Sequence, residues 1–461
     1  MNDFCVPPPA EPPLPAELSA AELSAADRRH LWHPFTQART APEPLPVIRA
    51  AGATLTLADG RSLCDLISSW WVTLHGHAHP TIAAAIARQA TQLEQVIFAD
   101  FTHPPAVHLG QRLAEWLPPG LSRLFFSDDG STAVEVALKL AWQFFRNQGQ
   151  ERRHFLAFAG GYHGDTFGAM AAGRGSGFYG PFQELLFPVH TLPYPETWIG
   201  DPEVMDKEAA SLAALERWLE RHGPETVALI VEPLVQGAAG MRMCRPEFLQ
   251  AVALRLKAAG VLLIFDEVMT GFGRTGPLFA SEAVGVAPDL LCLSKGLTGG
   301  FLPMALTVAT EAVYAAFLGP DFETAFAHGH SYTANPLGCA AALASLTLTV
   351  DPACVQRRAA IAARHTAALA ELAQRPGLEK PRVHGTIAAL SFHGHGHGYH
   401  AAIGRELKRF FFERGLLLRP LGNVVYLLPP YCITDAELDR AYAAIAEAAA
   451  RFGGTDLRAH P

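Results

Sequence analysis

The sequence lacks the features that would place the protein in a membrane, outside the cell or on nucleic acid. No apolar run approaches the roughly 20 residues that a membrane-spanning helix needs, and the first residues, MNDFCVPPPAEPPLPAEL, have neither the basic start nor the apolar core of a secretory signal. The seven cysteines are an odd number and form no C-x-x-C pair, which is typical of reduced thiols. The net charge of −8 comes without a cluster of Lys and Arg, so no nucleic-acid partner is expected. These absences favour a cytoplasmic protein.

The composition itself is that of an ordinary globular protein. The 461 residues are 49% hydrophobic and 17% charged, which indicates about two to three domains with sizeable cores. Residues 1–17 are rich in proline and predict a flexible leader. We expect residues 18–74 to be an N-terminal segment that joins a small domain, 75–334 to form a large ligand-binding domain, and 335–461 to form the C-terminal small domain.

Short apolar runs alternate with helical patterns through the middle of the chain. The runs lie at residues 124–127, 155–158, 227–231, 261–265, 290–293 and 305–308. Several lack polar alternation, as strands buried on both faces do, and helical patterns such as 132–147 and 245–259 lie between them. This alternation predicts an α/β fold with a mainly parallel sheet sandwiched by helices. Ligands on such sheets bind beyond the carboxyl ends of the strands, so chemistry is expected just after each run.

After residue 335 the pattern changes to that of a smaller α+β domain. Helices predicted at 336–349 and onward to 374 lead into strands near 387–392 and 424–428, and a strand-like piece at 53–57 could join them. The alternating histidines of residues 393–400 could bind metal, but alternate His in a Gly-rich loop has no fixed ligand geometry. We expect a mobile surface loop there, and no metal site.

A pair of carboxylates closes the apolar run that ends at Phe265. Asp266 and Glu267 are followed by a loop that contains three glycines. Taken alone, such an aspartate is more often the cap of a turn. In a site of low dielectric, however, it can hold a cationic ring nitrogen.

A single lysine, Lys295, follows the next apolar run and opens a Gly-rich stretch. The side chain of a lysine at the end of a strand usually points into solvent. After a buried strand, desolvation lowers the pKa of the amine, which can then form a Schiff base with an aldehyde. Asp266 and Lys295 together supply what pyridoxal phosphate needs, namely an anchor for its aldehyde and a partner for its pyridinium nitrogen.

A phosphate site is expected at residues 127–132, SDDGST, which follow one apolar run and open a long helix. Backbone N–H groups at a helix N-terminus bind phosphate well, although the same pattern also fits a routine helix cap. Asp128 and Asp129 would repel a phosphate, so we expect them to turn away from it. The spacing of a nucleotide-binding P-loop is absent.

These motifs resemble those of the class-III aminotransferases of fold type I, and the resemblance covers nearly the whole chain after the leader. Further motifs are similar to those of the members that aminate 8-amino-7-oxononanoate in biotin biosynthesis. They are HLWHPFTQ at 30–37, SSWW at 68–71, GYHGDTFG at 161–168, VQGAAGM at 235–241 and RPLG at 419–422. Relatives that handle ornithine, aminobutyrate or glutamate semialdehyde would share the Asp–Lys core but not these motifs.

The resemblance implies pyridoxal 5'-phosphate as the cofactor and a role for each matching residue. Lys295 would hold the cofactor and shuttle the proton between the substrate's α-carbon and the cofactor. Asp266 would keep the ring nitrogen protonated, and Tyr162 would cover the ring by stacking. Gly130 and Ser131 would bind the phosphate.

The resemblance also implies a set of substrate-binding residues. They are Phe35, Trp70, Asp165, Arg274, Gly329 and Arg419. Trp70 would line an apolar slot for the acceptor chain, with core packing as the alternative. Arg419 would pair with a carboxylate; Arg274 is a second candidate, or else a surface charge. Asp165 would receive a cationic amino donor, or else cap a helix.

The loop at residues 328–335, HGHSYTAN, crosses a homodimer interface in the family. The resemblance implies that Ser331 touches the cofactor phosphate of the neighbouring subunit, so that the two active sites are composite. The small-molecule substrates and a second copy of the chain are the expected partners.

The amino donor stays open between two candidates. The Trp70–Trp71 pair and the motif set favour adenosylmethionine. Phe35, where users of adenosylmethionine typically have Tyr, and the His330–Ser331 pair, where many members have Pro and Thr, favour lysine. Two broader alternatives are another class-III enzyme for ω-amino acids or diamines, and a catalytically silent relative that acts as a binding module.

Overall fold

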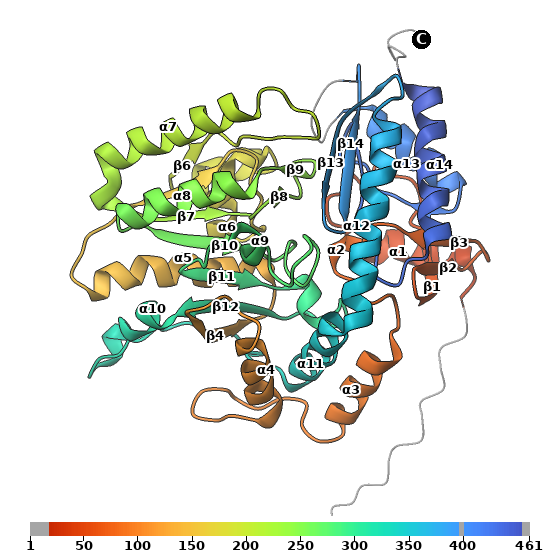
Figure 1. Ribbon diagram of the computed structural model, residues 1–461. Coiled ribbons are helices and arrows are strands. Elements are labelled where there is room, and N and C mark those ends of the chain that lie inside the picture. The colour runs from red at the N-terminus through yellow and green to blue at the C-terminus, as the bar shows by residue number, and fades with distance from the viewer. Residues whose placement is uncertain (1–17, 396–400, 454–461) are drawn as a thin grey trace, which may run out of the picture.

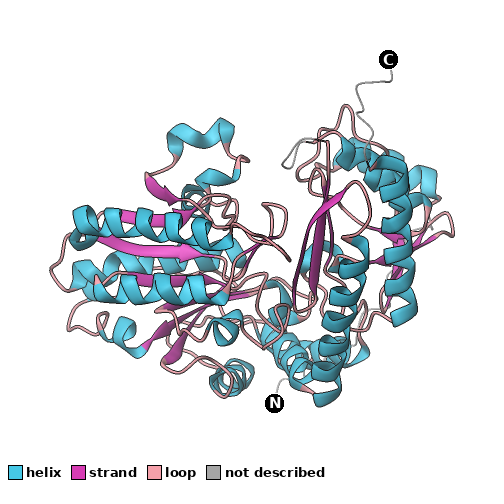
Figure 2. Ribbon diagram, turned by 45° about the horizontal axis from the view of Figure 1, so that its top comes forward, coloured by secondary structure: helices cyan, strands magenta, loops and turns pink. Residues whose placement is uncertain are grey.

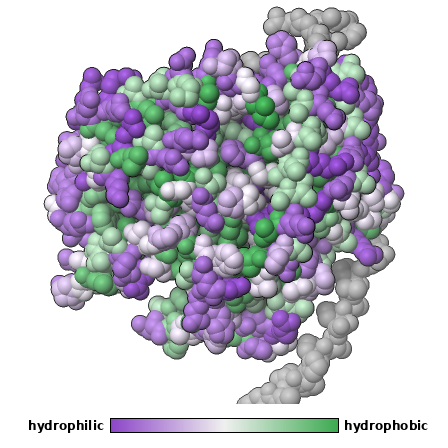
Figure 3. All heavy atoms as spheres, in the orientation of Figure 1, coloured by the Kyte–Doolittle hydropathy of each residue, from purple (hydrophilic) through white to green (hydrophobic). Residues whose placement is uncertain are grey.

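The computed structural model describes residues 18–395 and 401–453. The predicted leader at 1–17 and part of the His-rich segment, residues 396–400, therefore lie outside the described residues. Two lobes face each other, one built on a large sheet and the other on two small sheets with long helices beside them (Figure 1). On the face drawn in Figure 3, hydrophilic residues cover much of both lobes, with hydrophobic residues interspersed.

The larger lobe is organised around a seven-stranded sheet of order β4-β12-β11-β10-β7-β5-β6. Its strands are β4 (Leu121–Ser127), β5 (His154–Phe158), β6 (Val189–Leu192), β7 (Thr226–Val231), β10 (Leu262–Asp266), β11 (Leu290–Leu293) and β12 (Ala305–Thr310). The pairs β11–β10, β10–β7, β7–β5 and β5–β6 are parallel, whereas β12 runs antiparallel to both β11 and β4. The prediction of a mainly parallel sheet is confirmed.

Helices cover both faces of this sheet, as Figure 2 shows. Helix α5 (Gly130–Asn147) packs one face through a core that includes Ala137, Ile230 and Ile264. Helix α8 (Pro246–Ala258) packs the other face, with Phe248 and Leu263 in a second core. Strands buried on both faces are uniformly apolar, which is why β7, β10 and β11 read as unbroken apolar runs.

The remaining elements of the larger lobe are shorter or lie at its borders. They are α2 (Ser68–Trp71), α3 (Pro80–Ala90), α4 (Pro104–Ala114), α6 (Phe167–Ala172), α7 (Val204–His222), α9 (Ala280–Val284), α10 (Glu311–Ala315), and the hairpin of β8 (Val235–Gln236) and β9 (Arg242–Met243). Two short 3₁₀ turns matter below, η3 (Gly223–Glu225) after α7 and η4 (Lys295–Thr298) after β11. Strand β6 was not predicted from the sequence.

The second lobe combines both ends of the described chain. Strands β1 (Val47–Ala51), β2 (Thr54–Leu57) and β3 (Ser62–Asp65) form a sheet with β15 (Leu416–Leu417), and a second sheet contains β13 (Leu378–His384), β14 (Ile387–Phe392) and β16 (Val424–Leu427). Its helices are α1 (Ala20–His30), α12 (Pro352–Leu372), α13 (Ile403–Glu413) and α14 (Asp435–Phe452). Because β15 pairs in parallel with β3, the early and late segments meet, as the red and blue ribbons of Figure 1 show. The exact domain boundaries stay a prediction.

Helix α11 (Pro336–Val350) leads into α12 through a bend of 66°. Both helices agree with the predicted pair, and Pro352 stands at the start of the second one, where its ring is tolerated. In the described part of the chain, no single helix is long and apolar enough to cross a bilayer; the bent α11–α12 pair meets that test by length and composition alone.

Candidate active site

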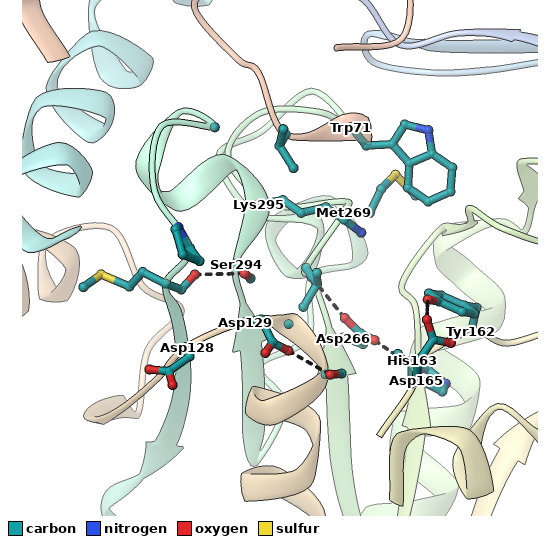
Figure 4. Close-up of a pocket in the computed structure, with 18 of the residues that line it drawn as sticks. Trp71, Asp128, Asp129, Tyr162, His163, Asp165, Asp266, Met269, Ser294 and Lys295 are labelled. Atoms are coloured by element: carbon teal, nitrogen blue, oxygen red, sulfur yellow. Dashed lines mark hydrogen bonds and ion pairs between the residues drawn. The ribbon is translucent and has the colours of Figure 1, made fainter. Parts of the chain in front are cut away.

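A cavity of about 450 Å³ opens at the carboxyl ends of the central strands. Its lining includes Trp71, Asp128, Ser131, Tyr162, Asp266 and Lys295. A volume of this size suits a cofactor or a small substrate. Figure 4 shows Asp266 and Lys295 reaching toward the same space from neighbouring strands, so the two residues singled out in the sequence are brought together.

Asp266 is the last residue of β10 and is only 4% exposed. Its Oδ1 accepts a hydrogen bond from the backbone N–H of Val268 at 3.1 Å, and its Oδ2 lies 2.7 Å from Nδ1 of His163. The imidazole of His163 is buried as well, and its other nitrogen, Nε2, has no hydrogen-bond partner among the described residues. The N–H of Val268 and the imidazole of His163 thus each hold one oxygen of the carboxylate, and Asp266 lines the cavity in a fixed orientation.

His163 was missed in the sequence as a residue of functional interest. It stands in the GYHGDTFG motif, where only Tyr162 and Asp165 attracted roles. Its partner is 103 residues away, and only the parallel pairing of β5, β7 and β10 brings the two together. Two strand-end loops that both carry hydrogen-bonding groups were the signal that could have suggested the contact.

Lys295 begins the η4 turn directly beyond β11 and Ser294. It has a φ of 41°, a left-handed conformation that is costly for a residue with a side chain and that is often found at functional sites. Its Nζ lies 5.0 Å from the centre of the Trp71 ring, and no hydrogen bond or ion pair joins it to the described residues. Burial lowers the pKa of the amine, while Asp266 and Glu232 partly oppose that shift. A lowered pKa makes the amine a better nucleophile toward an aldehyde.

The N-terminus of α5 forms another side of the cavity through Gly130 and Ser131. Asp129 is the helix cap, and its Oδ1 accepts from the N–H of Thr132 at 3.0 Å and from the hydroxyl of Ser131 at 2.8 Å. The first N–H groups of a helix have no partner within the helix, so those of Gly130 and Ser131 are available to an anion. Asp128 and Asp129 also line the cavity, and their turning away from a phosphate stays a prediction.

Glycines keep this wall of the cavity tight. A Cβ at Gly164 would lie 2.1 Å from Cβ of Ser131, and one at Gly130 would lie 2.6 Å from Cγ1 of Val268. The loops after β5 and β10 can therefore approach the start of α5 only because Gly164 and Gly130 lack a side chain. An amine, a carboxylate and a helix N-terminus thus surround one space, a set that fits the aldehyde, ring nitrogen and phosphate of pyridoxal phosphate.

Tyr162 and Asp165 lie at the side of the cavity next to His163 (Figure 4). The hydroxyl of Tyr162 donates to Oδ2 of Asp165 at 3.0 Å, and its backbone N–H donates to Oε1 of Glu232 at 2.9 Å. Glu232 is buried, and its burial raises the pKa of that carboxyl to about 7. Glu232 was not singled out in the sequence; here it anchors the loop that carries the Tyr162 ring.

The Trp-Trp pair is split by a strained turn. Ser68, Ser69 and Trp71 all have positive φ, at 52°, 58° and 67°. The turn is held by the buried carboxylate of Asp65, whose Oδ2 accepts from the N–H of Ser69 at 2.7 Å. As a result Trp71 is buried against the cavity, with its Nε1 donating to the hydroxyl of Tyr426, whereas Trp70 remains 43% exposed.

Trp70, Phe35 and Arg419 meet outside the cavity, at its mouth. The Phe35 ring lies edge-on to Trp70 at 5.9 Å and to Phe178 at 6.1 Å, and Phe178 in turn contacts Tyr162 of the cavity at 6.1 Å. The guanidinium of Arg419 stacks over Trp70 at 4.6 Å. Residues far apart in the sequence thus form one aromatic and cationic rim, which we call the mouth (Phe35, Trp70, Phe178 and Arg419).

Arg274 lies away from this rim. It is 1% exposed, its Nη1 donates to the carbonyl of Pro429 at 2.7 Å, and its Nη2 donates to that of Thr73 at 3.3 Å. It is not among the residues that line the cavity. The alternative of a surface charge is therefore wrong. The guanidinium ties the segment behind Trp71 to the C-terminal lobe, and a direct contact with substrate stays a prediction.

The loop at residues 328–335 lies beside the cavity rather than inside it. Gly329 and Ser331 are exposed and do not line the cavity of their own chain. Nδ1 of His330 comes within 3.8 Å of Asp128, which does line it, and the carbonyl of Ser331 accepts from Gln95 at 2.9 Å. The proposed contact of Ser331 with a neighbouring subunit is untested.

The chain is similar to known proteins over most of its length. The family model "Aminotransferase class-III" matches residues 36–449. The adenosylmethionine-8-amino-7-oxononanoate aminotransferase of Synechococcus elongatus is 57% identical over 418 residues, covering 91% of this chain and 98% of its own.

Solved structures agree with this relationship. The crystal structure of the adenosylmethionine-8-amino-7-oxononanoate aminotransferase from Methanocaldococcus jannaschii has a TM-score of 0.86 at 32% identity, over 93% of this chain and 99% of that one. An amine transaminase from an uncultivated Pseudomonas species, solved in a PLP-bound form, has a TM-score of 0.85 at 32% identity, over 92% and 99% of the two chains.

Proposed function

The chain belongs to the class-III aminotransferases, which are pyridoxal-phosphate-dependent enzymes, and we propose that it transfers an amino group to 8-amino-7-oxononanoate to give 7,8-diaminononanoate, a step of biotin biosynthesis. The observation that carries this substrate is the 57% identity, over nearly the full length of both chains, to a relative named for it. The mouth supports it, because Phe35, Trp70 and Arg419 come from motifs similar to those of that group and lie together.

Pyridoxal phosphate, when bound, supplies an aldehyde that takes up the amino group and a ring that withdraws electrons from the substrate's α-carbon. The carboxylate of Asp266, steadied by His163, would hold a proton at the ring nitrogen. Lys295 would anchor the cofactor, and its Nζ, whose pKa burial lowers, would take the proton from the substrate's α-carbon. The N–H groups of Gly130 and Ser131 would hold the phosphate.

The mouth suits a long acceptor with a terminal carboxylate. Trp70 and Phe35 offer apolar surface to a methylene chain, and the planar guanidinium of Arg419 offers paired donors to a carboxylate. Such a chain would run from the ketone beside Lys295 out past Trp71, which lines the cavity and contacts the lysine. Exclusion of water by these rings favours proton transfer inside the cavity.

We propose adenosylmethionine as the amino donor, in agreement with the name of the relative. Lysine is the second candidate, because Phe35 brings no hydroxyl to the mouth. Both donors carry an α-amino group, a carboxylate and a distant positive charge. Asp165, exposed beside Tyr162, would attract the cationic part of either donor.

The test is a donor panel in two steps. The cofactor-loaded enzyme is mixed with adenosylmethionine, lysine or a small diamine, and the loss of the cofactor's yellow absorbance is followed. The acceptor is then added and 7,8-diaminononanoate is measured by mass spectrometry. We expect conversion by adenosylmethionine and formation of the diamine product. Conversion by lysine alone would overturn the donor, whereas no product with any donor would overturn the acceptor and favour an enzyme for other amines.

A homodimer with composite sites and a cytoplasmic location complete the proposal. Support for the dimer is the exposure of large apolar side chains near the 328–335 loop and α4; they are Ile97, Phe101, Val107, Phe322 and Tyr332. Mixing inactive Lys295→Ala chains with chains inactivated at Ser331 should restore activity if each site draws on two chains. A fully active monomer in sedimentation would contradict the dimer.

The cytoplasmic location is supported by the six cysteines of the described chain, which are all free thiols.

A further inference from the structure

A second cluster of ligand-type side chains lies at the opposite end of the seven-stranded sheet. His154 is the first residue of β5, His222 is the last residue of α7, and Glu225 ends the η3 turn. One ligand atom from each lies within 4.8 Å of the other two. Four residues of rise along β5, about 13 Å, separate His154 from the end of the strand that faces the cavity, so this cluster is not part of the active site.

The backbone around the cluster is held in place before any ligand arrives. The hydroxyl of Thr226 donates to the carbonyl of His222 at 2.7 Å, and Trp218 Nε1 donates to that hydroxyl at 3.0 Å. The N–H of Arg153 donates to the carbonyl of Glu225 at 2.7 Å. The first two bonds link the end of α7 with the start of β7, and the third links the η3 turn with the segment before β5, so the spacing of the three side chains follows from the fold.

The rings are also preset by packing. Trp218 lies 4.4 Å from the His222 ring and 5.5 Å from the His154 ring, between centroids. The two imidazoles are 5.5 Å apart and nearly perpendicular, at 71°. They do not stack, so their nitrogens can converge on one point. Nε2 of His154 already lies 3.3 Å from a carboxylate oxygen of Glu225.

We propose that His154, His222 and Glu225 bind a divalent transition-metal ion, zinc foremost, with water completing the coordination. Two imidazole nitrogens and one carboxylate oxygen are a donor set that suits zinc and its neighbours in the first row. The contact of His154 with Glu225 explains only part of the arrangement, because it does not involve His222. All three side chains reach the surface, so an ion can enter.

The bound ion ties the end of α7 to the first residue of β5. It joins α7, which covers the sheet, to the sheet itself, at the end of the strands that lies away from the active site. Metal binding should therefore raise the thermal stability of the enzyme and leave its turnover unchanged. The sequence did not suggest this site, because His154 and His222 are separated by 68 positions and lack the short spacing of a metal-binding motif.

The experiment uses the full-length, cofactor-loaded enzyme after treatment with a chelator. Zinc binding is followed by calorimetry, and crystals soaked in zinc are measured at the zinc absorption edge to locate the ion. We expect one zinc ion at the three residues. His154→Gln, His222→Gln and Glu225→Gln should each weaken its binding by at least about tenfold, and His108→Gln, an exposed histidine on α4, should not.

The His-rich segment provides the necessary control, because its histidines can also take up zinc. A variant with His393, His395, His397 and His400 all replaced by glutamine should keep the zinc ion at the cluster. The proposal is overturned if that variant loses all zinc binding, if the wild type takes up no zinc, or if His154→Gln, His222→Gln and Glu225→Gln all bind zinc as the wild type does. Equal melting temperatures in chelator show that the variants fold, so each result bears on the site itself.

Discussion

The floor and the mouth of the cavity are built in different ways. The floor consists of Asp266 and Lys295, which follow neighbouring strands of one sheet, with Asp266 only 4% exposed. The mouth is assembled from the early segment, the C-terminal lobe and Phe178 of the larger lobe, and Phe35 and Trp70 are 49% and 43% exposed. A buried, rigid floor sets the type of reaction, since charges act strongly there. In the proposed function the exposed rim of rings selects the substrate, and exposed residues are replaced more easily than buried ones.

The largest expected effect is at the floor. In the proposed function Lys295 is both the anchor of the cofactor and the base, so we expect Lys295→Ala to lower turnover by at least about 10⁴-fold with every donor. Steady-state rates with each donor measure this, and borohydride reduction with peptide mapping shows whether the cofactor is attached to Lys295. Lys257→Ala, at an exposed lysine of α8, is the control. A label on any other lysine would refute the assignment.

Asp266→Asn should have the next largest effect. It takes a charged partner out of a buried pair, a loss typically of about 3–5 kcal/mol, of which part appears in the rate. We expect a fall of about 10²–10³-fold in kcat, with the folded state retained. The control is the neighbouring carboxylate, Glu267, which accepts from the N–H groups of Ala280 and Ser281 and lies outside the cavity.

Glu267→Gln should therefore act mainly on stability. We expect a lower melting temperature and only a small fall in kcat. If the two variants instead show the same loss of kcat, Asp266 has no special place in the chemistry. Near-normal turnover of Asp266→Asn would lead to the same conclusion.

His163→Leu should act through Asp266 and cost less. A hydrogen bond to a charged group is worth about 1.5–3 kcal/mol, so kcat should fall by about tenfold to hundredfold. The carboxylate keeps its bond from Val268, which is why the loss stays below that of Asp266→Asn. A double-mutant cycle with Asp266→Asn is the decisive measurement, because two residues that act as one unit are not additive. Fully additive losses would mean that His163 merely packs.

The floor could be predicted from the sequence far better than the mouth. Asp266 and Lys295 close uniformly apolar runs, and the strands they follow lie where those runs are, at Leu262–Asp266 and Leu290–Leu293. Strand β6 was missed because VHTL mixes polar with apolar residues, and His190 and Thr191 are exposed. A strand that is buried on both faces can thus be located from composition alone, whereas an edge strand cannot.

Contacts between residues that are far apart along the chain could not be predicted from the sequence. Which indole of the Trp70–Trp71 pair faces the cavity depends on the positive φ of Ser68, Ser69 and Trp71, and no residue type there demands that conformation. The pairing of His163 with Asp266 depends on strand order. Phe35, Trp70 and Arg419 were foreseen only through resemblance, and Phe178 was not foreseen, because these residues come from four separate segments of the chain.

At the mouth, Arg419→Lys should mainly raise KM. A lysine keeps the charge but loses the planar fork that can bind a carboxylate with two hydrogen bonds and that stacks over Trp70. We expect KM for 8-amino-7-oxononanoate to rise by about tenfold, worth about 1.4 kcal/mol, with kcat little changed. Initial rates over a range of acceptor concentrations measure both. A fall in kcat with constant KM would place Arg419 in the chemistry and break the contrast between floor and mouth.

The smallest expected effect is that of Phe35→Tyr, which tests the choice of donor. The ring already lies edge-on to Trp70 and Phe178, so a hydroxyl adds one hydrogen-bonding group without repacking the rim. One such bond is worth about 0.5–1.5 kcal/mol net, or up to about tenfold in rate. If adenosylmethionine is the donor, its half-reaction should quicken by up to that factor while the reaction with lysine stays slow. Phe178→Tyr, which alters the neighbouring ring of the same rim, is the matched control. A donor preference for lysine that persists in Phe35→Tyr would mean that the room for the adenosyl group, and not this hydroxyl, decides the donor.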